Sequence, residues 1–499
     1  MADPNNQLFA RFSTGAFFIF LIVAGILAGC MVGPNYHEPP ANAPTQWTSQ
    51  LRGGETNAPS TDAQWWKSFR DPELDNLIVR AAESNLNLSA AWARVRQARF
   101  ERQIVKGGFW PTVDGTAAYS YNRASATGLL PFPPGVPLDA NLYQAGFDSV
   151  WELDVFGATR RSLEAASAGV AAAEFGRRNL LLSVYGEVAR NYVQARAYQR
   201  RLQVLRKNIQ AQGQILDLTR DLFSKGLANE LDVRQGESLL ATTQSQEPEL
   251  ETGFRACAYH LAVLMGQQPG ALLDELSADA PAPSEPPVVP VGLPSDLIHR
   301  RPDIQQAERQ LAAATAQIGV AKADLFPQFS LTGDVGLESI QASDWFTAGS
   351  RYWTVGPMAQ WRIFEAGRIR ANIHLQTARQ EEALAAYEQT VLAAFEDVEN
   401  ALTAYAHEQI RRQSLTRAVV ANGQAAQLAE NLYRNGLADF LQVLESQRSL
   451  YQSQDALIES DATVSSNLIA LYKALGGGWD ETQSTTKVEE KQPPPPSHS

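Results

Sequence analysis

Histidines and acidic residues suited to catalytic or metal chemistry occur in this sequence, but their spacing matches no known site. The six histidines show no metal-ligand spacing: His37, His260, His299, His374, His407 and His498. His407-Glu408 begins like a zinc-protease helix, but the second histidine of that motif is missing. No phosphate-binding P-loop or nucleophile elbow is present, and solvated helix faces explain the acid pairs. We therefore expect no enzyme, no catalytic residue, no metal site and no cofactor.

The charge balance argues against a nucleic-acid partner. The 499 residues include 42 basic and 54 acidic side chains, a formal net charge of −12. Phosphate contacts supply most of the affinity for nucleic acid, and here no basic block offers them. Because 44% of the residues are hydrophobic, the chain has enough apolar surface for several packed layers.

The two cysteines, Cys30 and Cys257, lie in different contexts. Arg11 precedes an apolar run over residues 16–28, which is shorter than the about 20 residues that cross a bilayer but suits a signal peptide. The sequence LAGC at 27–30 resembles a bacterial lipobox, which predicts a signal peptide over 1–29 and a lipidated Cys30. An uncleaved membrane anchor is the alternative. A disulfide is possible on arithmetic alone, but acylation of Cys30 would leave Cys257 as a small core residue.

The strongest signal is an internal repeat. WELDVFG from Trp151 corresponds to WRIFEAG from Trp361, an offset of 361 − 151 = 210. LFSKGLANELDV from Leu222 matches LYRNGLADFLQV from Leu432 at the same offset, 432 − 222 = 210. Each copy is predicted to run helix, strand, loop, strand, long helix, tight turn, helix.

Two pairs of short segments alternate between apolar and polar residues, as strands do. They are Pro111 to Asn122 with Tyr143 to Leu153, and Gln328 to Glu338 with Trp353 to Ile363. A soluble half-buried sheet and a membrane barrel both have this period. Tryptophans and tyrosines near the strand ends favour the barrel, whose interfacial girdles are aromatic.

Two proline-free stretches, from about Ala158 to Leu222 and from Ala366 to Leu432, predict helices of some 65 residues, roughly 100 Å each. The return helix of the second copy carries a heptad of apolar residues, which keeps one face against a neighbouring helix: Val443, Leu450, Leu457, Val464 and Leu471. Gly226 and Gly436 lie between the helices, where glycine takes the left-handed C-cap conformation.

Four strands cannot close a barrel, and an open sheet edge in lipid leaves backbone groups unpaired. Several chains must then share one barrel. Two copies give eight strands with a nearly filled interior, whereas three give twelve strands and a lumen. The sequence favours three copies only if transport is the function.

Taken together, the motifs resemble the TolC-like outer-membrane factors, in particular the lipoprotein branch that serves resistance–nodulation–division pumps. The resemblance covers nearly the whole mature chain and rests on these segments: CMVGPNY at 30–36, WWKSF at 65–69, DPEL at 71–74, GLPSDL at 292–297, RPDI at 301–304, FP at 326–327 and GLAD at 436–439.

The resemblance implies an α+β membrane protein. Three chains would form a 12-stranded β-barrel, four strands per chain, continuous with a 12-helix α-barrel and girdled by a mixed equatorial domain. The expected segments are a signal peptide (1–29), an N-terminal equatorial segment (30–72), a first repeat (73–279), a linker (280–294), a second repeat (295–478) and a disordered tail (479–499). The expected location is the outer membrane, lipid-anchored and extending into the periplasm.

The family's functional positions lie at the hairpin tips, where they form a periplasmic constriction and dock the adaptor. The positions that match the constriction are Asp232, Gln442 and Glu445, and those that match the docking turns are Gly226, Leu227, Ala228, Gly436, Leu437 and Ala438. Three copies of Glu445 near an axis would repel one another and attract cations. Relatives carry a second carboxylate where this chain has Gln442. Solvated helix carboxylates and structural C-caps are the plainer interpretations.

The implied function is the exit duct of a tripartite efflux pump for small molecules. Its partners would be two further copies of the chain, a periplasmic adaptor, an inner-membrane resistance–nodulation–division pump and outer-membrane lipid. A duct for type I protein secretion shares this architecture. A periplasmic coiled-coil adaptor is a third possibility, but it would carry a lipoyl-like module instead of a full duplication.

Overall fold

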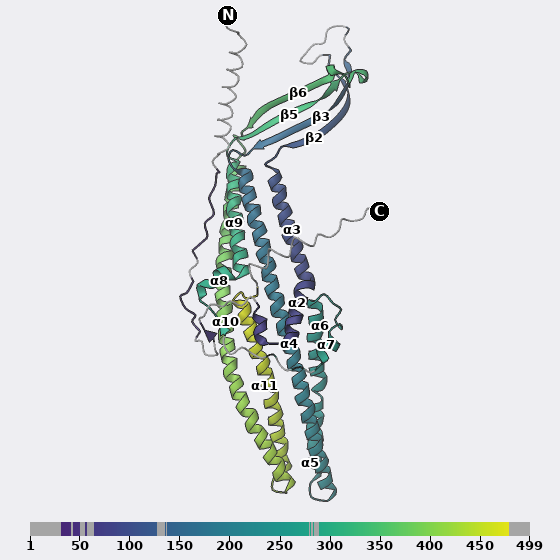
Figure 1. Cartoon of the computed structure of the whole chain (residues 1–499), viewed down its shortest axis with the longest axis vertical. Coiled ribbons are helices and arrows are strands. Elements are labelled where there is room, and N and C mark those ends of the chain that lie inside the picture. The colour runs from purple at the N-terminus through teal and green to yellow at the C-terminus, as the bar shows by residue number, and fades with distance from the viewer. Residues whose placement is uncertain are drawn as a thin grey trace. The chain divides into compact units, whose positions relative to one another are not determined.

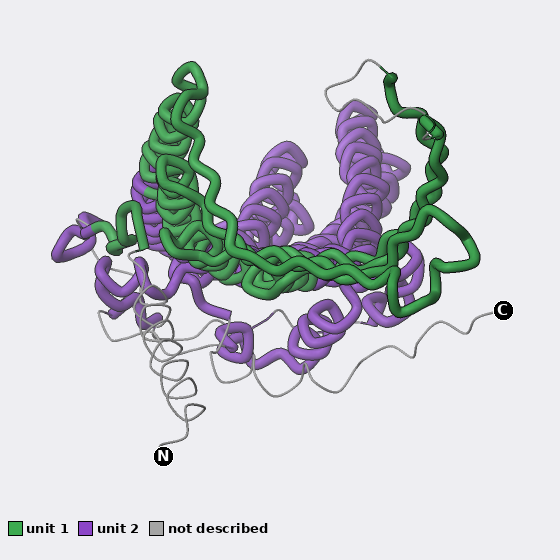
Figure 2. The backbone as a smooth tube through the Cα atoms, turned by 90° about the horizontal axis from the view of Figure 1, so that it is seen from above, with its two compact units in different colours: residues 1–39, 95–172, 307–387 green, residues 40–94, 173–306, 388–499 purple. Residues whose placement is uncertain are grey.

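The computed structural model describes residues 31–40, 43–49, 55–56, 64–126, 135, 137–278, 280, 283 and 289–478. Cys30, the expected signal peptide 1–29 and the expected tail 479–499 lie outside these residues. The chain folds into two compact units, coloured separately in Figure 2. Unit 1 comprises Met1–Pro39, Val95–Ala172 and Ala307–Tyr387, and unit 2 comprises Pro40–Arg94, Ala173–Gln306 and Glu388–Ser499. Each unit draws on both sequence copies.

Unit 1 contains one curved antiparallel sheet in the order β2-β3-β5-β6 (Figure 1). The strands are β2 (Thr112–Arg123), β3 (Asp139–Leu153), β5 (Gln328–Ser339) and β6 (Arg351–Gln360). Thr112 pairs with Val150, Tyr143 with Ser339, and Gln328 with Gln360. The outer edges of β2 and β6 have no strand partner among the described residues.

One face of the sheet is apolar and exposed, as the alternation predicts. Residues directly opposite in antiparallel strands share a face, so the row Gly115, Phe147, Val335 and Trp353 marks that face. Phe147 is 61% exposed and Trp353 is 74% exposed. An apolar face of this extent marks a surface that contacts lipid or protein.

Two details of the second strand pair differ from the sequence prediction. The strand expected to reach Ile363 ends at Gln360, so Trp361 and Ile363 follow it. The second long helix begins at Arg368 instead of Ala366, because Ala366 and Gly367 both have positive φ values, 47° and 85°. Trp361 nevertheless keeps a partner, since its indole N–H donates to the Leu325 carbonyl at 3.1 Å.

The two long helices, α4 (Ala158–Ser224) and α10 (Arg368–Arg434), each have 67 residues and begin 368 − 158 = 210 positions apart. The helices α3 (Leu86–Gly107) and α9 (Pro302–Ala323) precede the two strand pairs, and each has 22 residues. The helix α9 begins at the proline of the RPDI motif, because a proline fits the first turn of a helix.

The two return segments differ. The second is one helix, α11 (Phe440–Ala474), whereas the first is broken into α5 (Glu230–Gln244) and α6 (Glu247–Leu264). A single return helix was expected in both copies. Pro248, which lies at the start of α6, cannot continue a helix from α5 because its ring would clash with the preceding turn. The second copy has Ile458 at the matching position (458 − 248 = 210).

The main core lies in unit 2, where short elements pack on the long helices. These elements are the 3-10 helix η1 (Trp65–Phe69), α2 (Pro72–Ser84), α7 (Leu273–Ser277), α8 (Pro294–Arg300) and the parallel strand pair β1 (Glu55–Thr56) and β4 (Val289–Pro290). Trp65 is fully buried and stacks on Tyr472 of α11, with ring centroids 5.4 Å apart. Cys257 is buried in α6 as a free thiol, and burial raises its pKa to about 11, so it is an inert core residue.

Candidate functional site

The two helical hairpins of unit 2 end in turns of the same geometry. Gly226 and Gly436 have φ values of 74° and 71°. The Leu227 N–H donates to the Leu222 carbonyl, and the Leu437 N–H donates to the Leu432 carbonyl, each at 2.9 Å. This bond between residues five apart, closed by a left-handed glycine, is the Schellman C-cap. The glycines therefore have a structural role, as the plainer interpretation of these positions requires.

The leucines that follow these glycines are exposed. Leu227 is 73% exposed and Leu437 is 74% exposed, whereas Ala228 and Ala438 are half-buried. Among the described residues, no packing accounts for leucines in these two places. The structure therefore leaves the predicted docking positions accessible at both turns.

The two hairpins pack on each other just behind the turns. Phe440 is 3% exposed, and its ring lies 5.4 Å from that of Tyr433, beside Ile215 of α4. Gly236 allows this close packing, because a Cβ there would lie 2.9 Å from Leu216 and 3.2 Å from Phe440. The Tyr433 hydroxyl donates to Thr219 Oγ1 at 3.3 Å, which links α10 to α4.

Asp232 serves as a helix cap. Its carboxylate accepts the Asn229 N–H at 3.2 Å, while the Asn229 side chain accepts the Asp232 N–H at 2.9 Å, which completes a capping box for α5. The spacing Asn-x-x-Asp is a sequence signal for this motif that our interpretation of Asp232 missed. Burial raises the pKa of the nearby Tyr433, and the charge of Asp232 raises it further.

Gln442 and Glu445 lie on the first turns of α11 and are both exposed. Gln442 occupies the position that Asp232 holds in the first copy (442 − 232 = 210), but its backbone N–H donates to the Asp439 carbonyl. Glu445 has no ion-pair partner within the described ranges. Of the three predicted constriction residues, Glu445 is thus the carboxylate left free for another role.

Above the turns, a row of polar contacts joins α4 to α11. Arg201 donates to Asp455 through two nitrogens, at 2.6 and 2.8 Å, and Asn208 donates to Gln454 at 3.1 Å. A further bond joins α11 to the break between α5 and α6, where the Tyr451 hydroxyl donates to Gln246 at 2.6 Å. The sequence does not reveal these pairs, because each joins residues more than 200 positions apart.

In unit 2, a matching junction occurs in each sequence copy. At each one, the end of the return helix is hydrogen-bonded to the residue just before the helix that precedes the strand pair. Asn85, before α3, donates to the Leu264 carbonyl at 2.7 Å. Arg301, before α9, donates to the Ala474 carbonyl at 3.1 Å, and 474 − 264 = 210. Arg301 also pairs with Asp303 at 2.7 Å and with Asp397 of α10 at 3.0 Å. One junction is therefore neutral and the other ionic.

In unit 1, hydrogen bonds and close packing fix the segment just after Cys30. Arg161 of α4 is 1% exposed, and its guanidinium donates to the Val32 carbonyl at 3.1 Å and to Asn35 Oδ1 at 2.8 Å. Gly157 and Gly319 make room, since a Cβ on Gly157 would lie 2.8 Å from Met31 and one on Gly319 would lie 2.7 Å from Arg161. The described chain thus starts in a fixed position.

We expect Arg161→Met to lower the free energy of unfolding by about 3 kcal/mol, because it removes the hydrogen bonds that the buried guanidinium donates to Val32 and Asn35 and its ion pair with Glu164. Thermal denaturation measures the loss, and hydrogen exchange at Val32 and Gly33 reports whether the segment has come loose. Arg102→Met removes an exposed arginine of α3 and serves as the control, with an expected change within about 0.5 kcal/mol. Equal stability of the two variants would show that the contacts of Arg161 contribute nothing to the free energy of unfolding.

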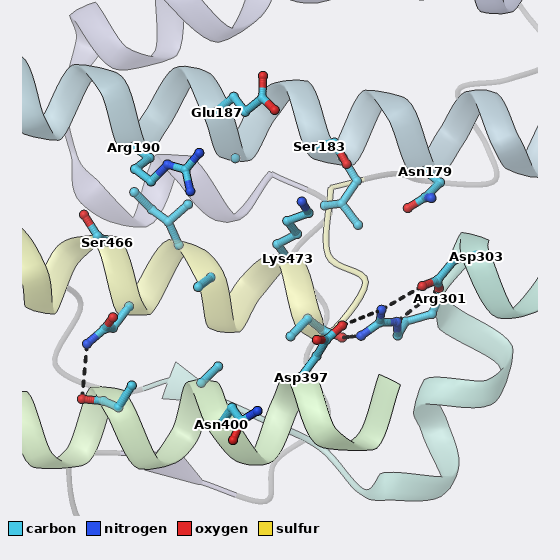
Figure 3. Close-up of a pocket in the computed structure, with 18 residues that line it drawn as sticks. Asn179, Ser183, Glu187, Arg190, Arg301, Asp303, Asp397, Asn400, Ser466 and Lys473 are labelled. Atoms are coloured by element: carbon cyan, nitrogen blue, oxygen red, sulfur yellow. Dashed lines mark hydrogen bonds and ion pairs between the residues drawn. The ribbon is translucent and has the colours of Figure 1, made fainter. Parts of the chain in front are cut away.

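A cavity of about 540 Å³ lies in unit 2 between α4, α10 and α11, next to the start of α9 (Figure 3). The Arg301 junction forms one end of it, and Arg190 and Lys473 line it from α4 and α11. Across the described residues, no cluster of three or more histidine, cysteine or acidic side chains could hold a metal ion. Among the same described residues, no helix is both long and apolar enough to span a bilayer.

Comparison with known proteins identifies the family. The family profile "Outer membrane efflux protein" matches residues 77–267 and 293–477. The pyoverdine export outer membrane protein OpmQ of Pseudomonas putida is 35% identical over 449 residues, which cover 89% of this chain and 93% of the relative. Nodulation protein T of Rhizobium leguminosarum bv. trifolii is 31% identical over 473 residues, 95% of this chain and 98% of that protein.

Among solved structures, the outer-membrane channel OprN superposes with a TM-score of 0.83 at 36% identity, covering 90% of this chain and all of that one. The open state of the MtrE outer membrane channel of Neisseria gonorrhoeae gives a TM-score of 0.77 at 27% identity, covering 90% and 98%. The chain belongs to the outer membrane efflux protein family, and it is an outer-membrane efflux channel.

Proposed function

We propose that this chain forms the exit duct of a tripartite pump, in which three copies share one 12-stranded barrel and one 12-helix barrel. The observation that carries the proposal is the sheet of unit 1, which has an exposed apolar face and two edges, β2 and β6, without a strand partner among the described residues. An edge strand in lipid needs a partner for its backbone groups. Pairing β2 of one copy with β6 of the next satisfies both edges.

Exposed apolar side chains on two helices of unit 2, α10 and α6, support the same assembly. In unit 2, Leu392, Val420 and Leu428 of α10 are 58–63% exposed, and Val263 of α6 is 55% exposed. A head-to-tail interface between copies uses two different surfaces and closes into a ring when the rotation permits. We assign these two helices to opposite sides of that interface.

The proposed partners are a periplasmic adaptor, which docks at the turns around Leu227 and Leu437, and an inner-membrane resistance–nodulation–division pump. Small molecules would pass from these partners to the exterior. The names of the relatives, which include solvent and toluene efflux pump proteins of Pseudomonas putida, favour efflux over protein secretion. We also propose that a signal peptide (1–29) is removed and that Cys30 carries the lipid anchor. The proposal includes the segments expected from the sequence, with boundaries at residues 72, 279, 294 and 478.

We propose that Glu445 lines the periplasmic constriction, where three copies repel one another and attract cations. Glu445→Gln is expected to reduce block of the purified channel by multivalent cations about tenfold or more, measured in planar bilayers. Glu430→Gln is a control on α10, because Glu430 pairs with Arg434 on its own helix at 2.6 Å. Cation block that is the same in the wild type and both variants would exclude Glu445 from the constriction.

A further inference from the structure

The cavity between α4, α10 and α11 contains polar groups that the fold does not use. At one end, Arg301 satisfies the carboxylates of Asp303 and Asp397. Arg190 of α4 and Lys473 of α11 also line the cavity, and both side chains are exposed. Neither cation has a hydrogen-bond or ion-pair partner in the described part of the chain. The carboxylates of Asp303 and Asp397 are therefore paired with Arg301, whereas Arg190 and Lys473 are left unpaired among the described residues.

Figure 3 shows that the side chains of Arg190 and Lys473 both project into the space between α4 and α11. Glu187, one turn before Arg190, also lines the cavity, but in Figure 3 its carboxylate points away from the Arg190 guanidinium. The acidic group nearest in sequence therefore does not neutralise Arg190. Asn400 and Ser466, from α10 and α11, add neutral hydrogen-bonding groups to the lining.

Helix packing alone does not require this polarity. The positions of α11 that line the cavity include Ser466, Asn467 and Lys473. At an offset of 210, the first copy has Ala256, Cys257 and Val263 at the corresponding places on α6. A return helix of this fold thus forms with small or apolar residues at these positions. The polar groups that α11 adds to the cavity are therefore not a requirement of the repeated fold.

We propose that this cavity binds a small organic anion bearing carboxylate groups, with Arg190 and Lys473 contacting the carboxylates. Charge-assisted hydrogen bonds from guanidinium and ammonium groups are among the strongest that a protein offers to an oxyanion. The volume of about 540 Å³ lies within the range of small-molecule sites. Asn400 and Ser466 would bind the neutral part of the ligand. Trimer formation is not needed for this site, because a single chain supplies every group.

Titration calorimetry of the full-length protein in detergent, with citrate as the probe, tests the proposal. We expect saturable binding with a Kd near about 1 mM, and no binding of glycerol, which has the hydroxyl groups but no charge. Lys473→Met and Arg190→Gln are each expected to weaken citrate binding about tenfold, since each removes one charge-assisted contact.

Lys207→Met is the matched control, because Lys207 is an exposed lysine of α4 outside the cavity. It is expected to bind citrate like the wild type. Both cavity residues are exposed, so circular dichroism and melting temperatures should match across the set. Absence of saturable binding up to about 10 mM citrate would overturn the proposal, as would an equal affinity in all four proteins. Neither result would bear on conduction, which bilayer recordings measure separately.

Discussion

Replacing Leu227 and Leu437 together by aspartate is expected to reduce efflux to the level of cells that lack the channel. Both side chains are more than 70% exposed at the turns, where only an external partner would bury them. Carboxylates there would have to be desolvated in an apolar contact, which costs several kcal/mol per group. Efflux of a fluorescent substrate from intact cells and co-purification of the adaptor measure the effect.

The same positions supply the control for this prediction. Leu227→Met with Leu437→Met keeps the turns apolar and is expected to retain efflux. The conductance of the purified aspartate variant should stay within about twofold of the wild type, because the Schellman caps depend on Gly226 and Gly436. Normal efflux by the aspartate variant would remove the turns from the docking surface.

Phe440→Ala is expected to increase the conductance of the purified channel and to speed hydrogen exchange in the first turns of α11. The Phe440 ring fills the space between Tyr433, Ile215 and Gly236, so its removal leaves a cavity where the two hairpins meet. Removing a buried phenylalanine costs about 3–5 kcal/mol. Since this contact lies next to the proposed constriction, loosening it should widen the passage.

Leu441→Ala changes the neighbouring residue, which is 53% exposed, and is the matched control. It should exchange and conduct like the wild type. If Phe440→Ala leaves both exchange and conductance unchanged, packing between the hairpins does not limit the channel.

Sequence periodicity predicted the parts of this fold that depend on local patterns. The strand alternation located β2, β3 and β5, and the glycines at 226 and 436 marked the hairpin turns, because a left-handed C-cap requires a residue without a Cβ penalty. The break before α6 also has a local cause, Pro248, but the similarity of the two copies hid it.

Contacts between distant segments could not be predicted in this way. Arg161 reads as one more arginine on a long polar helix, yet it is buried and binds residues 126 or more positions away. Arg301 belongs to the RPDI motif, but its pairing with Asp397 depends on how α9 meets α10. The capping role of Asp232 is different, because its Asn-x-x-Asp spacing is visible in the sequence, although the resemblance implied only a place in the constriction.

Disulfide cross-linking between the two sheet edges tests most directly whether separate chains share one pore wall. Cysteines at Val113 or Ala117 of β2 are combined in turn with cysteines at Val355 or Ala359 of β6, in a Cys257→Ala background; these positions share the apolar face of the sheet. Since β2 and β6 are the opposite edges of the sheet within one chain, a bond between them must join two chains. A ring of three predicts that oxidation gives, for at least one pair, covalent species that stop at the trimer on denaturing gels. Only monomers for every pair, or a ladder that continues beyond three chains, would contradict the shared barrel.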